Sequence, residues 1–222
     1  MKGCLFIVST PIGNFRDITL RAMNVLEEVD AVISEEYRHG STLLKKLSIA
    51  EKELILLNEH NEKADSLMIA KELAQGKRYA LISDCGTPAF TDPGTELIRL
   101  SMENGIPVIP VPGPSSLMAA ISLSPLPLDE FYFVGFLPRK KEIRHKKLSA
   151  LKEMKVPIIL MDAPYRLSRL LSEVITAFGR ARNITLAFNL TLPGEKVLHD
   201  TAEHILQKMS DKKGEFILIV YP

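Results

Sequence analysis

The sequence predicts an α/β protein of two domains, with a mostly parallel sheet in the first and a mixed sheet in the second. Three observations lead to this fold class. The chain has 222 residues, more than the roughly 150 typical of one domain. Apolar runs typical of strands alternate with segments of helical spacing. Six of the 14 prolines lie between Pro107 and Pro127, which predicts a stiff connection between residues 1–113 and residues 114–222.

In the first half, strands and helices alternate. Short continuous apolar runs predict strands that are buried on both faces, at residues 5–8, 31–33, 54–57, 79–82 and 108–109. Apolar residues at helical spacing predict the intervening helices, at residues 20–30, 43–47, 67–74 and 97–100. Gly76 is placed to stop the third of these helices. This alternation predicts a parallel sheet covered on both faces.

The second half is more mixed. Strand-like runs occur at residues 131–134, 157–161, 184–188, 197–198 and 216–220. Helical patterns occur at residues 115–123, 140–154, 165–178 and 202–209. The last strands follow one another without full helical crossovers, which predicts antiparallel pairing in part of this sheet.

Composition sets the general class of protein. Apolar residues make up 46% and charged residues 25% of the chain, as in folded domains rather than disordered chains. No run of 18 apolar residues is present, so we expect no membrane span. The N-terminal residues do not resemble a signal peptide, and the two cysteines, Cys4 and Cys85, cannot form a disulfide framework. A reducing, cytoplasmic location is therefore expected.

Several common kinds of site are excluded by their motifs. No two glycines lie two residues apart, so the dinucleotide-binding fingerprint is absent. Gly76-Lys77-Arg78 lacks the Ser or Thr of a Walker loop, and no Gly-x-Ser-x-Gly elbow is present. The five histidines are not spaced as metal ligands, so we expect no metal site.

Three polar loops rich in Gly and Pro follow buried strands, at residues 9–14, 83–94 and 111–116. All leave the carboxyl ends of strands, the edge at which open α/β sheets bind ligands. The second loop carries Asp84 and Asp92 and spans twelve residues, where a simple strand-to-helix turn takes about two to six. We therefore predict a ligand site here, although turns and caps alone would also use Gly and Pro.

Charge differs between the two halves. Residues 1–113 carry 12 basic and 16 acidic side chains, and residues 114–222 carry 16 and 11. Six strong bases fall within residues 139–147, namely Arg139, Lys140, Lys141, Arg144, Lys146 and Lys147. This run predicts contact with RNA phosphates, and the alternative is a solvated helix face. Because aromatics are not interleaved with the bases, structured RNA held by shape and phosphate fits better than stacked single strands.

Together the loops resemble those of a known family. Thr10-Pro11-Ile12-Gly13-Asn14, Gly86-Thr87-Pro88, Asp92-Pro93-Gly94 and Pro112-Gly113-Pro114-Ser115 match the tetrapyrrole methylase superfamily of S-adenosylmethionine-dependent methyltransferases. Within it, the chain is similar to the bacterial enzymes that methylate the ribose 2′-oxygen of a cytidine in 16S ribosomal RNA. The match continues through Gly135-Phe136-Leu137-Pro138-Arg139 and covers essentially the whole chain.

The resemblance implies a class III methyltransferase fold, S-adenosylmethionine as cofactor in a cleft between the two domains, and a homodimer. It also implies which residues line the cofactor pocket. These are Pro11, Asp84, Gly86, Thr87, Pro88, Ala89 and Ser115, with Met161 from the second domain.

Deprotonating a ribose hydroxyl calls for a base or a nearby cation. Our catalytic candidates are Glu35 and Arg38 together with Asp84, while a surface ion pair is the alternative for Glu35 and Arg38. Residues 188–192 depart from the family pattern by losing three charged positions. This departure leaves open a methyltransferase that acts on a small molecule or protein, and a cofactor-binding assembly factor without catalysis.

Overall fold

The computed structural model describes residues 3–49, 52–90 and 92–222. The chain divides into two compact units, Met1–Ser115 and Ser116–Pro222. This division lies two residues after the expected boundary at residue 113. Thr91, which belongs to the second predicted loop, lies outside the described residues.

The first unit is built on a parallel sheet of five strands in the order β3-β2-β4-β1-β5. The strands are β1 (Cys4–Val8), β2 (Ala31–Ser34), β3 (Glu53–Leu56), β4 (Arg78–Ile82) and β5 (Val108–Val111). The prediction of a parallel sheet is therefore confirmed. β3 lies at an edge of the sheet, and Leu56 is exposed.

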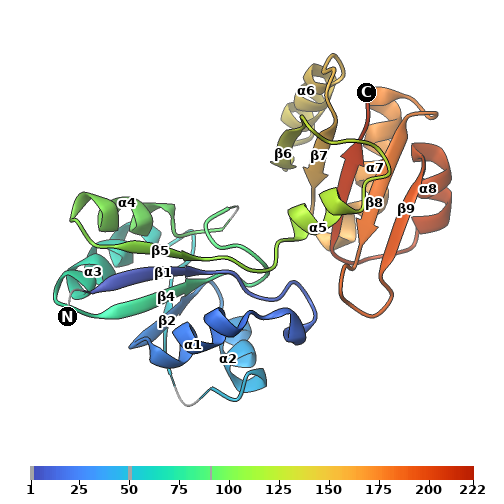
Figure 1. Cartoon of the computed structure of the whole chain (residues 1–222). Coiled ribbons are helices and arrows are strands. Elements are labelled where there is room, and N and C mark those ends of the chain that lie inside the picture. Colours follow the sequence, from blue (N-terminus) through green and yellow to red (C-terminus); the bar gives the residue numbers. More distant parts are fainter. Residues whose placement is uncertain (1–2, 50–51, 91) are drawn as a thin grey trace. The chain divides into compact units, whose positions relative to one another are not determined.

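Helices cover both faces of this sheet (Figure 1). They are η1 (Phe15–Asp17), α1 (Leu20–Glu28), α2 (Tyr37–Lys46), α3 (Glu62–Ala74) and α4 (Thr95–Glu103). α1 and α2 pack on the face that carries Val8 and Val32, and α3 and α4 pack on the face that carries Leu5 and Ile33. Successive strand residues thus enter opposite cores, which explains why the strands are apolar without alternation.

β1 and β4 are neighbours in the sheet, and the chain leaves their carboxyl ends in opposite directions. Such a place is the topological switch point of an open α/β sheet. The chain leaves β1 toward α1 on one face and leaves β4 toward α4 on the other. Loops that diverge in this way leave a crevice between them, and ligands of open α/β sheets bind in such crevices.

The second unit contains a mixed sheet in the order β6-β7-β10-β8-β9, in which only β6 and β7 pair in parallel. Its strands are β6 (Tyr132–Phe136), β7 (Ile158–Met161), β8 (Asn183–Phe188), β9 (Lys196–Thr201) and β10 (Phe216–Val220). Its helices are α5 (Ser116–Ser122), α6 (Lys141–Leu151), η2 (Pro164–Arg166), α7 (Leu167–Phe178) and α8 (Ala202–Met209). The predicted mixed sheet is confirmed.

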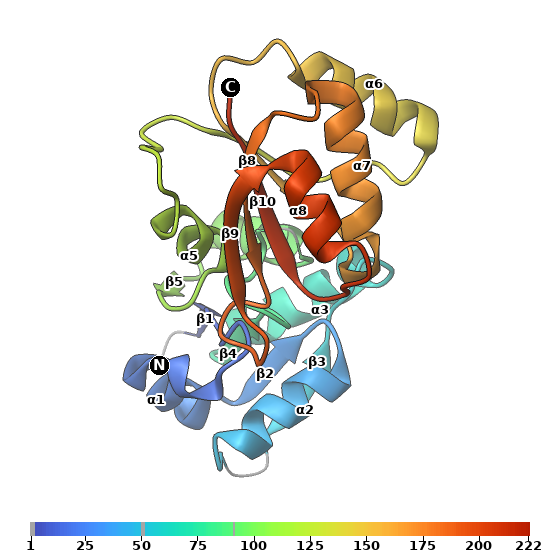
Figure 2. The same ribbon diagram turned by 90° about the vertical axis from the view of Figure 1, so that its right-hand side faces the viewer.

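The main core of this unit lies between the sheet and helices α6, α7 and α8, and Figure 2 shows α7 and α8 on one side of the strands and α5 on the other. A smaller core beneath α5 contains Ala120, Ile159 and Ile219. No helix in the described part of the chain has the length and apolar character that a membrane span requires.

One predicted RNA-binding residue belongs to this interior. Arg144 is 1% exposed and shares the inward face of α6 with Leu148 and Leu151. Its guanidinium lies 2.6 Å from Asp162 and 2.5 Å from Glu173. The prediction that Arg144 binds RNA is therefore wrong: a nine-residue run that enters a helix cannot present every side chain to solvent, and position 144 falls on the buried stripe.

Candidate active site

Hydrogen bonds join the three predicted loops within the first unit. The backbone N–H of Thr10 donates to the carbonyl of Gly86 at 2.9 Å, and the Thr10 hydroxyl donates to the carbonyl of Ser83 at 2.9 Å. The third loop is joined through Thr87, whose hydroxyl donates to the carbonyl of Pro114 at 3.4 Å. The structure thus brings together the ends of β1, β4 and β5, through contacts between residues 73 and 76 positions apart for the first two loops and 27 positions apart for the last two.

Two glycines permit this close approach. Gly86 has a φ of +89°, and a Cβ added to it would lie 3.3 Å from the Ile12 side chain and 3.7 Å from the Pro114 carbonyl. A Cβ on Gly113 would lie 3.1 Å from the Cβ of Ser9. Side chains at these positions would push the loops apart, so glycine is required by backbone conformation at Gly86 and by space at Gly113.

The second loop is fixed by polar side chains. The Ser83 hydroxyl donates to Asp92 at 2.5 Å and accepts from the backbone N–H of Cys85 at 3.0 Å. Glu62 accepts from the backbone N–H of Gly94 at 2.7 Å and thereby satisfies the start of α4. Ala89 adopts a φ of +58°, a conformation that costs a residue with a side chain free energy and that is typical of ligand-binding loops.

Asp84 tests whether this arrangement fits the cofactor that the family resemblance implies. Its Oδ1 atom is buried and has no hydrogen-bond partner among the described residues, while Oδ2 lies 2.6 Å from Nδ1 of His39. A buried carboxylate oxygen without a donor is costly. A ligand with amine or hydroxyl donors, as S-adenosylmethionine has, would supply the missing partner, so the residues present fit that group.

The other predicted cofactor residues fall into two sets. Pro11, Gly86 and Pro88 are buried, and Thr87, Ala89 and Ser115 are exposed or half-buried in the same three loops. The first unit therefore contains all of the predicted cofactor residues except one. Met161 ends β7 of the second unit and is half-buried.

The catalytic candidates follow β2, the strand next to β4. Glu35 is half-buried, and its pKa is raised above the ordinary value by burial and then by the nearby carboxylates, with Asp92 and Asp84 the strongest. Arg38 is exposed in the first turn of α2. Within the described residues, Glu35 and Arg38 do not form an ion pair with each other, so they are not the surface pair considered as the alternative.

His39 was not predicted as a site residue, yet it lies at the centre of this edge. Its partner Asp84 is 45 residues away along the chain. Only the pairing of β2 with β4 brings the two side chains together. Glu36, His39 and Asp84 offer three ligand atoms within 4.8 Å of one another. We assign no metal to them, because exposed acidic groups of this kind are common without an ion.

The basic run of the second unit keeps five of its six predicted residues at or near the surface. Arg139, Lys140, Lys141 and Lys146 are exposed and Lys147 is half-buried. We call these five residues the basic surface; Arg139 and Lys140 precede α6, and the other three lysines belong to it.

Residues 188–192, which depart from the family pattern, have a structural role in the second unit. Phe188 is buried in the main core, and Asn189 and Thr191 turn the chain with φ values of +49° and +64°. The large apolar side chain at position 188 therefore contributes to packing.

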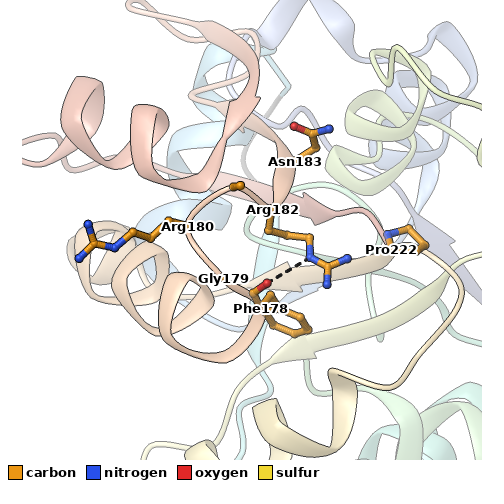
Figure 3. Close-up of a pocket in the computed structure, with 7 residues that line it drawn as sticks. Phe178, Gly179, Arg180, Arg182, Asn183 and Pro222 are labelled. Atoms are coloured by element: carbon orange, nitrogen blue, oxygen red, sulfur yellow. Dashed lines mark hydrogen bonds between the residues drawn. The ribbon is translucent and has the colours of Figure 1, made fainter.

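A pocket in the second unit contains none of the predicted site residues (Figure 3). It is a shallow depression of about 520 Å³ between the end of α7 and the start of β8, and residues 178–183 and Pro222 line it. Arg182 donates to the backbone carbonyls of Phe178 and Tyr221. Because its guanidinium stabilises the local backbone, we do not assign a ligand to this pocket.

Comparison with known proteins shows the family of the chain. The profile of the family described as Tetrapyrrole (Corrin/Porphyrin) Methylases matches residues 4–206. A protein named Ribosomal RNA small subunit methyltransferase I from Halalkalibacterium halodurans is 38% identical over 221 residues, which cover 99% of this chain and 76% of that protein. A protein of the same name from Xylella fastidiosa is 40% identical, covering 98% of this chain and 81% of the relative.

Solved structures show the same fold at lower identity. Diphthine synthase superposes with a TM-score of 0.76 at 16% identity, covering 98% of this chain and 89% of that one. Uroporphyrin-III C-methyltransferase from Thermus thermophilus, complexed with S-adenosylhomocysteine, gives a TM-score of 0.68 at 19% identity and covers 99% and 97%. With three loops joined at a switch point and a family profile that spans most of its length, this chain belongs to the tetrapyrrole methylase family of S-adenosylmethionine-dependent methyltransferases.

Proposed function

We propose that this protein transfers a methyl group from S-adenosylmethionine to the ribose 2′-oxygen of a cytidine in small-subunit ribosomal RNA. The observation that carries the proposal is the joining of the three loops at one edge of the sheet, where Asp84 has a buried oxygen without a partner among the described residues. The chain is also 38–40% identical to two proteins named for small-subunit ribosomal RNA methylation. A ribosomal RNA substrate would place the protein in the cytoplasm.

We propose that the first unit holds the cofactor at the joined loops, with Met161 contributing from the second unit. The residues in contact would be Pro11, Asp84, Gly86, Thr87, Pro88, Ala89, Ser115 and Met161. When bound, S-adenosylmethionine supplies a methyl group made electrophilic by its sulfonium. The protein's own contribution is to orient the acceptor oxygen, and alignment of this kind contributes about 7–11 kcal/mol in well-oriented reactions.

Glu35 and Arg38 are our proposed catalytic residues beside that site. Burial and the nearby carboxylates raise the pKa of Glu35, which favours a role in proton exchange. Arg38 offers a cation for the oxygen that becomes negative as its proton leaves. Both side chains come from the end of β2 and the start of α2, next to Asp84.

The basic surface is proposed to bind the RNA. Its four lysines and Arg139 present a concentrated positive charge for phosphates. Aromatic side chains are not interleaved with these bases in the sequence, which favours structured RNA recognised by shape. We also propose a homodimer, which sedimentation of the purified protein would test.

A transfer assay tests the function directly. Cells lacking this gene provide small ribosomal subunits without the modification, and the purified protein is incubated with them and with cofactor labelled in the methyl group. We expect label in the 2′-O-methyl group of a cytidine of the ribosomal RNA. Label in ribosomal protein or in a small molecule would contradict the proposal and favour the other substrates of this fold, and cofactor binding without transfer would favour an assembly factor.

A further inference from the structure

His39 and Asp84 form a dyad at the edge of the first unit where the loops meet. His39 lies in the first turns of α2, and its Nδ1 atom is 2.6 Å from Oδ2 of Asp84. Asp84 begins the loop after β4, the loop that is joined to the other two. The histidine therefore lies beside the segments that we propose to hold the cofactor.

The hydrogen bond sets the tautomer of the imidazole. A carboxylate only accepts hydrogen bonds, so Nδ1 carries the hydrogen and the neutral ring has its lone pair on Nε2. The His39 side chain is 54% exposed, which leaves Nε2 accessible to a ligand. A histidine oriented by a carboxylate in this way is the arrangement that serves as a base in enzymes that activate hydroxyl groups.

We propose that His39 accepts the proton of the acceptor hydroxyl through Nε2 and that Asp84 is its positioning residue. The proposal rests on the proposed function. As the ribose oxygen bonds to the methyl carbon, the carbon–sulfur bond breaks with its electron pair going to sulfur, and the hydroxyl proton passes to Nε2. The resulting imidazolium is balanced by the Asp84 carboxylate, and no further reactant is needed.

The surrounding charges suit this role. The pKa of His39 is raised above its ordinary value, first by the hydrogen bond to Asp84, against an opposing contribution from burial. Glu36, 3.8 Å from Nδ1, also raises the pKa, and Arg38 lowers it. A base whose pKa is raised from 6.5 toward the working pH is more effective at proton transfer. Glu35, the earlier candidate, would then tune the local field rather than take the proton.

His39→Gln tests the proposal, and His204→Gln is a matched control. His204 forms the same kind of pair, with its Nδ1 atom 3.0 Å from Oδ1 of Asp200, but lies in α8 of the second unit. Transfer of labelled methyl to small ribosomal subunits is measured from pH 5.5 to 9, with cofactor affinity by calorimetry and melting temperature as checks. We expect His39→Gln to lower kcat by about 10²–10⁴-fold, with cofactor affinity and melting temperature unchanged, and His204→Gln to behave as wild type.

The pH profile separates proton transfer from a structural role. Wild-type kcat falls as the pH drops through the pKa of His39, and this acidic limb disappears in His39→Gln. An unchanged rate, or an acidic limb that persists, overturns the proposal while leaving the function intact. A rate lost in chelator and restored by Mg²⁺ also overturns it, because Glu36, His39 and Asp84 would then act as cation ligands. A wild-type protein that methylates no ribosomal RNA overturns both the function and this proposal.

Discussion

Replacing Arg144 with Met tests whether this arginine stabilises the fold or binds RNA. The guanidinium is 1% exposed and lies between the carboxylates of Asp162 and Glu173, which are 2% and 11% exposed. Removing it leaves two buried negative charges without their shared cation. Breaking a buried ion pair in this way costs about 3–5 kcal/mol of unfolding free energy.

The structure places the expected loss toward the lower end of that range. Glu173 keeps Arg169 at 2.9 Å and Asp162 keeps Arg166 at 3.5 Å, so each carboxylate retains a second cation. The Arg144 guanidinium and Asp162 Oδ2 are 2.6 Å apart but do not form a well-aligned hydrogen bond, so less energy is lost when the arginine is removed. We therefore expect a loss of about 3 kcal/mol, which lowers the melting temperature of a chain of this size by about 6–12 °C.

Thermal and urea unfolding measure this loss, with Lys146→Met, at an exposed position of the same helix, as the control. We expect the control to change the unfolding free energy by less than about 0.5 kcal/mol. RNA binding by Arg144→Met, measured below its melting temperature, should keep the wild-type salt dependence. A variant that remains as stable as wild type but loses RNA affinity would refute the assignment of Arg144 to the interior.

Three further outcomes are expected. Replacing the four lysines of the basic surface with Gln should weaken RNA binding and reduce the slope of log affinity against log salt by about three to four, and equal salt slopes in filter binding would contradict an RNA-binding role. Gly86→Ala places a side chain on a residue with a φ of +89°. It should lower the unfolding free energy by about 1–3 kcal/mol and weaken cofactor binding by about tenfold or more. Calorimetry that finds wild-type affinity would show that the loop does not touch the cofactor. Glu35→Gln should lower turnover without changing cofactor affinity. It should also raise the melting temperature at pH 7, because a carboxyl with a raised pKa stabilises the folded protein when protonated, and this stability is lost as the pH rises through that pKa. A variant with the same rate and the same stability at pH 7 would remove Glu35 from the mechanism.

Much of the fold could be predicted because its patterns are local. The apolar run at Leu5–Val8 indicates a strand buried on both faces, and the structure places Leu5 and Val8 in the two different cores of the first unit. The late strands of the second unit indicated a mixed sheet because they follow one another without full helical crossovers, which is also visible within a short stretch of sequence. Strand order, however, depends on long-range pairing, and no local pattern showed that β4 lies between β2 and β1.

The site shows the same division between local and distant information. The loops could be predicted from their glycines, prolines and carboxylates, because those residues act within a few positions of one another. His39 could not, since its partner Asp84 becomes a neighbour only through the order of the sheet. Arg144 was misplaced for the opposite reason: its neighbours in sequence are solvated bases, and only the period of the helix, which aligns it with Leu148, turns it inward.

The two clusters of charged side chains differ in a way that bears on function. In the second unit, Arg144 is paired with Asp162 and Glu173, and Arg166 and Arg169 add further positive charge, so each carboxylate of the cluster faces two arginines. In the first unit, the charged groups that shift the pKa of Glu35 are all carboxylates among the residues that the structure describes. Like charges held together destabilise a fold, so such a cluster is a feature of sites that a ligand completes. A sulfonium carries a positive charge that would offset the carboxylates around Glu35. The electrostatics of these carboxylates thus favour the same cofactor as the glycines and prolines of the loops.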